Sequence, residues 1–197
     1  AALRLVGFYQ RDGGYIDNVR ATRTFTLGDN NPATNVTVNN ANLVEKDYND
    51  VDTYGGRAAL KIDLDDSWTV TPAIIYQHQV SHGNFSFDKT KGDLKVSDFR
   101  PTRNLDRFYT AALTIEGTIS DFDLVYSGGY LDRRIDSHSD YTDYSFFYDT
   151  LFGSGAYITD ASGAIINPTQ RITGRDHLTR LSNEIRLSSP QDSRFRY

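Results

Sequence analysis

The stretch GRAALKIDLDDSWTVTPAIIYQ, residues 56–77, decides the fold because it reads as two strands joined by a very short turn. Apolar and polar residues alternate in its first half, and this period of two predicts a strand with two different faces. One face carries Ala58, Leu60, Ile62 and Leu64, and the other carries Arg57, Ala59, Lys61 and Asp63. The function depends on whether the apolar face contacts a second sheet or lipid.

The same alternation recurs along the chain, and no segment has convincing helical spacing. The sequence therefore predicts an all-β fold, an antiparallel up-and-down meander. Pro72 lies in one of these strands and has no N–H, so we expect a bulge or a missing ladder bond there. The alternating segments are AALRLVGFYQ (1–10), TYGGRAALKIDL (53–64), WTVTPAIIYQ (68–77), FYTAALTIEGTI (108–119), FDLVYSGGYL (122–131) and RLSNEIRLSS (180–189).

The connections between these segments alternate strictly between long and short. In a meander, this places all long connections at one end of the sheet and all tight turns at the other. Outer-membrane β-barrels have this asymmetry, with long external loops and short periplasmic turns, whereas a sandwich has no reason for it. The long connections are 11–52, 81–105 and 135–176, and the short ones are 65–67, 120–121 and 189–193.

The aromatic residues support lipid on the apolar face. Trp68 and Phe122 directly follow short turns, and Tyr76 and Tyr130 follow eight residues later on the same faces. Eight residues of a tilted strand rise about 20 Å, close to the apolar band of about 25 Å between the aromatic girdles of outer-membrane barrels. The opposite face would then line a wet lumen, where charge is tolerated. The charged residues expected there are Arg57, Lys61, Asp63, Glu116, Glu184 and Arg186.

Composition excludes several classes of protein. The 197 residues carry a net charge of −5, which disfavours a nucleic-acid partner. There is no Cys, so disulfides and thiolate metal sites are excluded. No apolar run is long enough for a transmembrane helix. The chain begins within an apparent strand, and residues 193–197 resemble the start of another, so we expect a fragment of a longer protein.

Five segments resemble the barrel of TonB-dependent outer-membrane receptors, closest to the large group of sphingomonad-type and related Gram-negative bacteria. The most specific piece is the E-x-R-L-S-S-P pattern of 184–190. The segments are LRLVGFYQRDGGYIDN (3–18), GRAALKIDLDDSWTVTP (56–72), DRFYTAALTIEGTISDFDLVYSGGYLDR (106–133), SDYTDYSFFYD (139–149) and NEIRLSSPQDSRFRY (183–197).

The resemblance implies a parent barrel of about 22 strands closed by a plug. Such a receptor imports a scarce nutrient (siderophore-bound iron, cobalamin, a saccharide or similar) across the outer membrane, with energy passed through the TonB complex. Residues 1–197 would be a partial barrel domain without the plug or the C-terminal strands. Its partners would be membrane lipid, lipopolysaccharide, the TonB complex through the absent N-terminal part, and a small-molecule ligand.

The segment 136–155 is the richest candidate for ligand contact, because it interleaves aspartates with aromatic side chains. Tyrosine supplies a flat face and a hydrogen-bonding rim at a low entropic cost, which suits flat or glycosidic ligands. The same residues could instead pack a long loop into an ordered cap. The candidate ligand-binding residues are Tyr141, Tyr144, Phe146, Phe147, Tyr148 and Tyr157.

Metal and catalytic chemistry have little support. His138 lies among aspartates without an ordered ligand pattern, and His78 and His82 would lie too far apart along a strand for one metal. His177 is expected at the surface. We predict no metal site, no cofactor and no enzymatic activity, because no catalytic motif is present. Two alternatives to the receptor remain: a passive porin-like channel, and a soluble secreted carbohydrate-binding β-domain.

Overall fold

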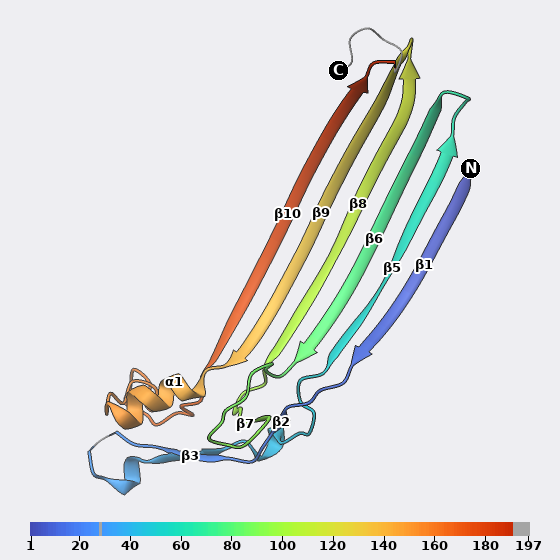
Figure 1. The fold of residues 1–197 in the computed structure, drawn as a ribbon. Coiled ribbons are helices and arrows are strands. Elements are labelled where there is room, and N and C mark those ends of the chain that lie inside the picture. Colours follow the sequence, from blue (N-terminus) through green and yellow to red (C-terminus); the bar gives the residue numbers. More distant parts are fainter. Residues whose placement is uncertain (28, 191–197) are drawn as a thin grey trace.

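The computed structural model describes residues 1–27 and 29–190, and its main element is one six-stranded antiparallel sheet (Figure 1). Neighbours in the sheet follow chain order, so the predicted all-β, up-and-down meander is confirmed. The predicted start of a further strand at 193–197 lies outside the described residues. The strands are, in spatial order, β1 (Ala2–Asp12), β5 (Val51–Asp63), β6 (Trp68–His82), β8 (Arg103–Ile119), β9 (Phe122–Asp140) and β10 (Arg171–Ser188).

Tight turns and long connections lie at opposite ends of the sheet, as predicted (Figure 1). The turn between β5 and β6 forms because the Asp65 carboxylate accepts hydrogen bonds from the backbone N–H groups of Ser67 (2.7 Å) and Trp68 (2.8 Å). The turn between β8 and β9 places Ser120 at a φ of 57°. The short connections therefore form locally, without help from the long ones.

Pro72 lies in β6 between two neighbouring strands. Its pairing with β8 is continuous, opposite Leu113, whereas the ladder between β5 and β6 has no pairs between Ala59–Ala73 and Ile62–Val70. The register is the same on both sides of this gap. The expected loss of a ladder bond is confirmed, because proline has no N–H to donate. The unchanged register means that no bulge forms.

The register places most of the apolar residues of the six strands on one face of the sheet. Directly opposite residues of an antiparallel pair lie on the same face, so cross-strand rows can be followed through all six strands. One such row contains Leu5, Ala58, Ile74, Ala111, Tyr130 and Leu181. This face is uncovered: Leu181 and Ile185 of β10 are each 71% exposed, and Leu5 of β1 is 68% exposed.

The opposite face is mixed and carries the charged residues predicted for the lumen. All six occupy this face by register: Arg57, Lys61, Asp63, Glu116, Glu184 and Arg186. Two pairs of them are ion pairs along one strand, Lys61–Asp63 (3.8 Å) and Glu184–Arg186. Apolar side chains such as Phe8 and Phe108 share this face.

The long connections form a packed cap at one end of the sheet (Figure 1). Its small elements are β2 (Asp17–Asn18) paired with β7 (Lys95–Val96), β3 (Thr22–Phe25) paired with β4 (Val36–Asn39), the turns η1 (Pro32–Thr34) and η2 (Ala41–Leu43), the helix α1 (Thr142–Phe146), and the π-helical turn η3 (Phe147–Leu151). The buried hydrophobic residues of the described chain all lie in these connections: Ile16, Phe25, Tyr48, Val96, Phe99 and Ile158.

Two details of the cap differ from the expectations. The helical turns of 142–151 were not expected, and they are too short to leave a periodic apolar pattern. The third long connection is also shorter than predicted, because β9 continues to Asp140 and β10 begins at Arg171. Asp136 and His138 therefore lie in β9 and not in a loop, and His177 lies within β10, exposed at the surface as expected.

Candidate ligand-binding site

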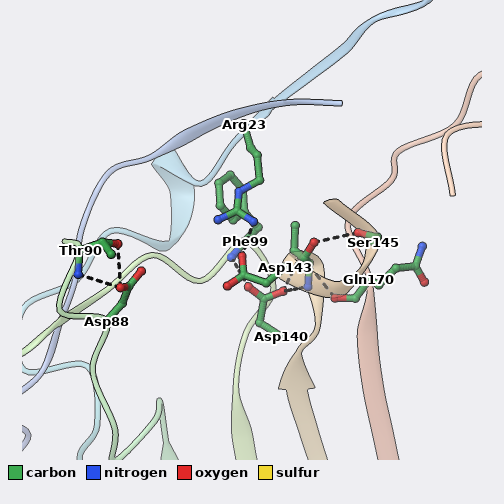
Figure 2. A network of polar contacts seen from close by, with 9 residues as sticks. Arg23, Asp88, Thr90, Phe99, Asp140, Asp143, Ser145 and Gln170 are labelled. Atoms are coloured by element: carbon green, nitrogen blue, oxygen red, sulfur yellow. Dashed lines mark hydrogen bonds and ion pairs between the residues drawn. The ribbon is translucent and has the colours of Figure 1, made fainter. Parts of the chain in front are cut away.

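Asp140, at the end of β9, anchors the segment of the cap that contains the candidate ligand-binding residues. Its Oδ1 accepts hydrogen bonds from the Thr142 N–H (3.0 Å) and hydroxyl (2.5 Å), which starts α1. Its Oδ2 accepts the Phe99 N–H (2.8 Å), which ties the second long connection to the third (Figure 2). The Ser145 hydroxyl donates to the Thr142 carbonyl and closes the first turn of the helix.

Arg23 of β3 joins the first long connection to the third. Its guanidinium lies 4.6 Å from the ring centre of Phe146. It also lies 5.6 Å from the ring centre of Phe99 and forms an ion pair with Asp143 (Figure 2). Phe146 also meets Phe25 edge-on, with 5.4 Å between the ring centres. A cation between aromatic faces favours this packing. Phe146, a predicted ligand contact, is therefore turned toward β3.

Asp149 stabilises the next part of the same connection, residues 149–157. It is fully buried, and its carboxylate accepts hydrogen bonds from the Ser154 hydroxyl (2.8 Å) and the Tyr157 N–H (3.0 Å). Gly155 lies between them at a φ of +65°, where a Cβ would lie 2.6 Å from the Leu27 Cδ2, so only glycine fits without strain. This turn brings Tyr157 back against α1.

All four predicted tyrosines meet in one cluster around Tyr144. Its ring centre lies 4.7 Å from those of Tyr141 and Tyr148 and 6.2 Å from that of Tyr157. The hydrogen bond with Tyr148, and then burial, raise the pKa of Tyr144 to about 12. Tyr144 therefore stays a neutral phenol, which can donate and accept hydrogen bonds.

The remaining predicted aromatic, Phe147, packs on Phe152 with 4.7 Å between the ring centres. Phe152 was not among the predicted ligand contacts, because it lies four residues after Tyr148, where the main run of aromatic residues ends. Phe152 and Leu151 are 68% and 65% exposed, so they extend the apolar surface of the tyrosine cluster.

An acidic hollow of about 290 Å³ lies beside this cluster. Its lining includes Asp88, Asp98, Asp140 and Asp143, together with Tyr141 and Tyr144. Such a lining accepts hydrogen bonds from a neutral or cationic group and disfavours a strongly anionic one. The volume is at the low end for a ligand pocket, so it suits one group of a larger ligand.

The pKa values of two aspartates of this hollow are shifted in opposite directions. Burial raises the pKa of Asp98 to about 6, against the hydrogen bond from the Thr102 hydroxyl (2.9 Å), and the charges of Asp140 and Asp143 raise it further. Hydrogen bonds from the hydroxyl and the N–H of Thr90 lower the pKa of Asp88 (Figure 2). The charge of the hollow therefore changes near pH 6.

The histidines have structural partners. His78 stacks on Tyr54 (4.7 Å between ring centres), and His82 hydrogen-bonds Asp50 (2.8 Å). Within residues 1–27 and 29–190, no group of three or more His, Cys, Asp or Glu side chains is arranged to hold a metal ion. None of the helices in the described ranges has the length and apolar character to cross a membrane.

Comparisons with protein-family models, with curated proteins and with solved structures found no match for this chain.

Proposed function

We propose that this chain forms part of the barrel wall of a TonB-dependent outer-membrane receptor, with its apolar face in lipid and its cap on the external side. The observation that carries the proposal is the location of apolar surface. The six-stranded sheet exposes most of its large apolar residues on one face, whereas the buried apolar core of the described residues lies in the cap. Exposed apolar surface of this extent is characteristic of a membrane or interaction face.

The height of the apolar face supports lipid as its partner. The apolar rows begin at Trp68, beside the short turns, and end at the row of Tyr76 and Tyr109. The eight residues from Trp68 to Tyr76 span about 20 Å across a bilayer when the strands are tilted as in outer-membrane barrels. Beyond the two tyrosines, the same face carries Arg107 and Arg134. The band is therefore bounded by aromatic and charged side chains on the loop side.

The opposite face and the two edges are also consistent with a barrel wall. A wet lumen accommodates the six charged residues of the mixed face without burying them in a dry core. The edge strands β1 and β10 pair on one side only within the described residues. In a membrane such edges must be paired, so residues 1–197 would be a partial barrel domain that further strands complete.

The packed cap favours ligand capture over free passage through an open channel. Tyr141, Tyr144, Tyr148 and Tyr157 gather over the strand ends beside the acidic hollow. Energy coupling through TonB rests on the family resemblance alone. Iron chelates, cobalamin, saccharides and aromatic compounds all remain candidate ligands, and the acidic hollow favours neutral or cationic groups on them.

Single-cysteine labelling tests the proposal directly, because the chain contains no Cys. Leu113 and Thr114 are neighbours in β8 that lie on opposite faces. The complete barrel that contains this chain, with any cysteine outside residues 1–197 replaced, is placed in liposomes with a fluorophore on Leu113→Cys or on Thr114→Cys. We expect lipid-borne bromine to quench the label at 113 and aqueous iodide to quench the label at 114. Equal quenching at both positions, or no membrane insertion, would refute the lipid-facing assignment.

A further inference from the structure

The three long connections of the cap are joined to one another in two different ways. Neutral groups join the first connection (13–50) to the second (83–102), because β2 pairs with β7 and two buried amides reach the second connection. The side-chain N–H groups of Asn18 and Asn40 donate to the carbonyl of Asp98, at 3.3 and 3.1 Å. Amide groups do not titrate, so this junction should keep one arrangement as the pH changes.

Aspartates join the third connection (141–170) to the second. The Asp140 carboxylate accepts the Phe99 N–H (2.8 Å), and the hydroxyl oxygen of Thr102 accepts the Asp140 N–H (3.2 Å). The same hydroxyl donates to Oδ2 of Asp98 (2.9 Å). A single hydroxyl group therefore links the carboxylate of Asp98 to the residue at which the third connection leaves the sheet. We call these contacts the Asp98–Asp140 joint.

Asp98 is buried in this joint without a cation to pair with it. It is 7% exposed, and no ion pair joins it to a basic side chain within residues 1–27 and 29–190. A buried carboxylate without a cation is costly in its ionised form. The titratable and charged groups around Asp98 come from all three connections and the end of β9: Arg23, Tyr48, Asp88, Asp140, Tyr141, Asp143 and Tyr144.

We propose that the Asp98–Asp140 joint responds to protons: the third connection stays packed on the second while Asp98 is protonated and separates from it when Asp98 is ionised. The acidic hollow lies between these connections, since Asn84 and Asp88 line one side of it and Tyr141 and Tyr144 the other. Separation widens the hollow and moves the tyrosine cluster, and acid closes it. The consequence for ligand capture rests on the proposed function.

The size of the effect follows from the protonation of Asp98 in the two arrangements. Its pKa in the packed cap is about 6, above the ordinary value of 3.8, because burial and then the charges of Asp140 and Asp143 outweigh the Thr102 hydrogen bond. The packed arrangement is therefore fully favoured below about pH 4 and loses this advantage as the pH rises through 6. Between pH 5 and 7.5, the ratio of separated to packed molecules should rise by at most about tenfold.

Distances between spin labels test the proposal in the complete barrel that contains this chain, with any cysteine outside residues 1–197 replaced. The pair Lys89→Cys and Ala156→Cys spans the joint. The control pair Lys46→Cys and Lys89→Cys spans the neutral junction between the first and second connections. All three labelled positions are exposed. Double electron–electron resonance gives the distance distribution of each pair between pH 5 and 7.5.

We expect the distribution across the joint to shift to longer distances with a midpoint near pH 6, and the control distribution to stay constant. Asp98→Asn cannot ionise, so it should keep the packed distance at every pH. Asp88→Asn is the matched control in the same hollow. Hydrogen bonds from Thr90 lower the pKa of Asp88, which stays ionised over this range, so Asp88→Asn should respond as the unmodified protein does.

A distance across the joint that does not change with pH in the unmodified protein would overturn the proposal, whether or not Asp98→Asn folds. An unchanged pH response in Asp98→Asn would overturn it too, and so would an equal shift in the control pair. Insertion into liposomes is measured in parallel for each protein. A barrel that inserts but shows no pH-dependent distance refutes the joint alone, whereas failure to insert refutes the proposed function.

Discussion

An arginine placed at Leu113 tests both the depth and the side of the apolar face. Leu113 lies four residues from Tyr109 and four from Gly117, which pairs with Trp68, so it lies at the middle of the band, about 10 Å from either boundary. An arginine on the lipid side of an outer-membrane barrel costs about 2–4 kcal/mol at the midplane and about 0–1 kcal/mol near the interface. Leu113→Arg should therefore lower the folding equilibrium constant by about 30- to 1000-fold.

Two matched variants provide the controls. Tyr109→Arg tests the boundary on the same face, and Thr114→Arg tests the opposite face at the same depth. Both should change the equilibrium constant by about fivefold or less. The measurement is the folded fraction in liposomes across a urea series, read from the gel mobility of unboiled samples. A cost at Tyr109 equal to that at Leu113 would refute the depth assignment, and an equal cost at Thr114 would refute the assignment of faces.

Three further predictions concern the cap. The pKa of Asp98 in the folded cap is about 6, above the ordinary value of 3.8. The protonated Asp98 therefore stabilises the folded cap fully below about pH 4. This stabilisation is lost as the pH rises through 6, by at most about 3 kcal/mol. Proteolytic resistance of the cap should therefore fall between pH 4 and 7, and less so in Asp98→Asn. Arg23→Gln should raise hydrogen exchange in residues 142–151 by an amount equivalent to about 1–2 kcal/mol, because Phe146 loses its cation. Asp149→Ala should release Tyr157 and weaken the cap by about 2–3 kcal/mol, seen as faster proteolysis at 154–157.

Each cap prediction has a result that would contradict it. A pH dependence unchanged in Asp98→Asn would assign the titration to another group. Unchanged exchange over 142–151 in Arg23→Gln would mean that the ring contacts between Phe25 and Phe146 hold the connections without the cation. If Asp149→Ala leaves cleavage at 154–157 unchanged, the carboxylate does not hold Tyr157. In all three variants the sheet should keep the fold that it has in the unmodified protein, since none of these residues lies in a strand of the six-stranded sheet.

The strands were predictable because their signal is local. Side-chain direction alternates with each residue, so the pattern of 56–64 already assigns Leu60 and Lys61 to opposite faces. Turn chemistry is local as well: Asp65 caps its own turn, and Pro72 removes its own ladder bond. Strict alternation of long and short connections then orders the strands into a meander. None of this requires a contact between distant residues.

The cap depends on contacts between residues that are far apart in the sequence. Arg23 meets Phe146 and Asp143, and Asp140 meets Phe99; no spacing in the sequence predicts such pairs. The sequence named the four tyrosines whose rings the structure brings together, but only the tertiary structure turned Phe146 toward β3 and packed Phe152 on Phe147. The sequence alone thus determined the sheet, its two faces and its two ends, because backbone geometry repeats every two residues. Tertiary structure alone decided the acidic hollow, because its aspartates come from different connections that meet side by side.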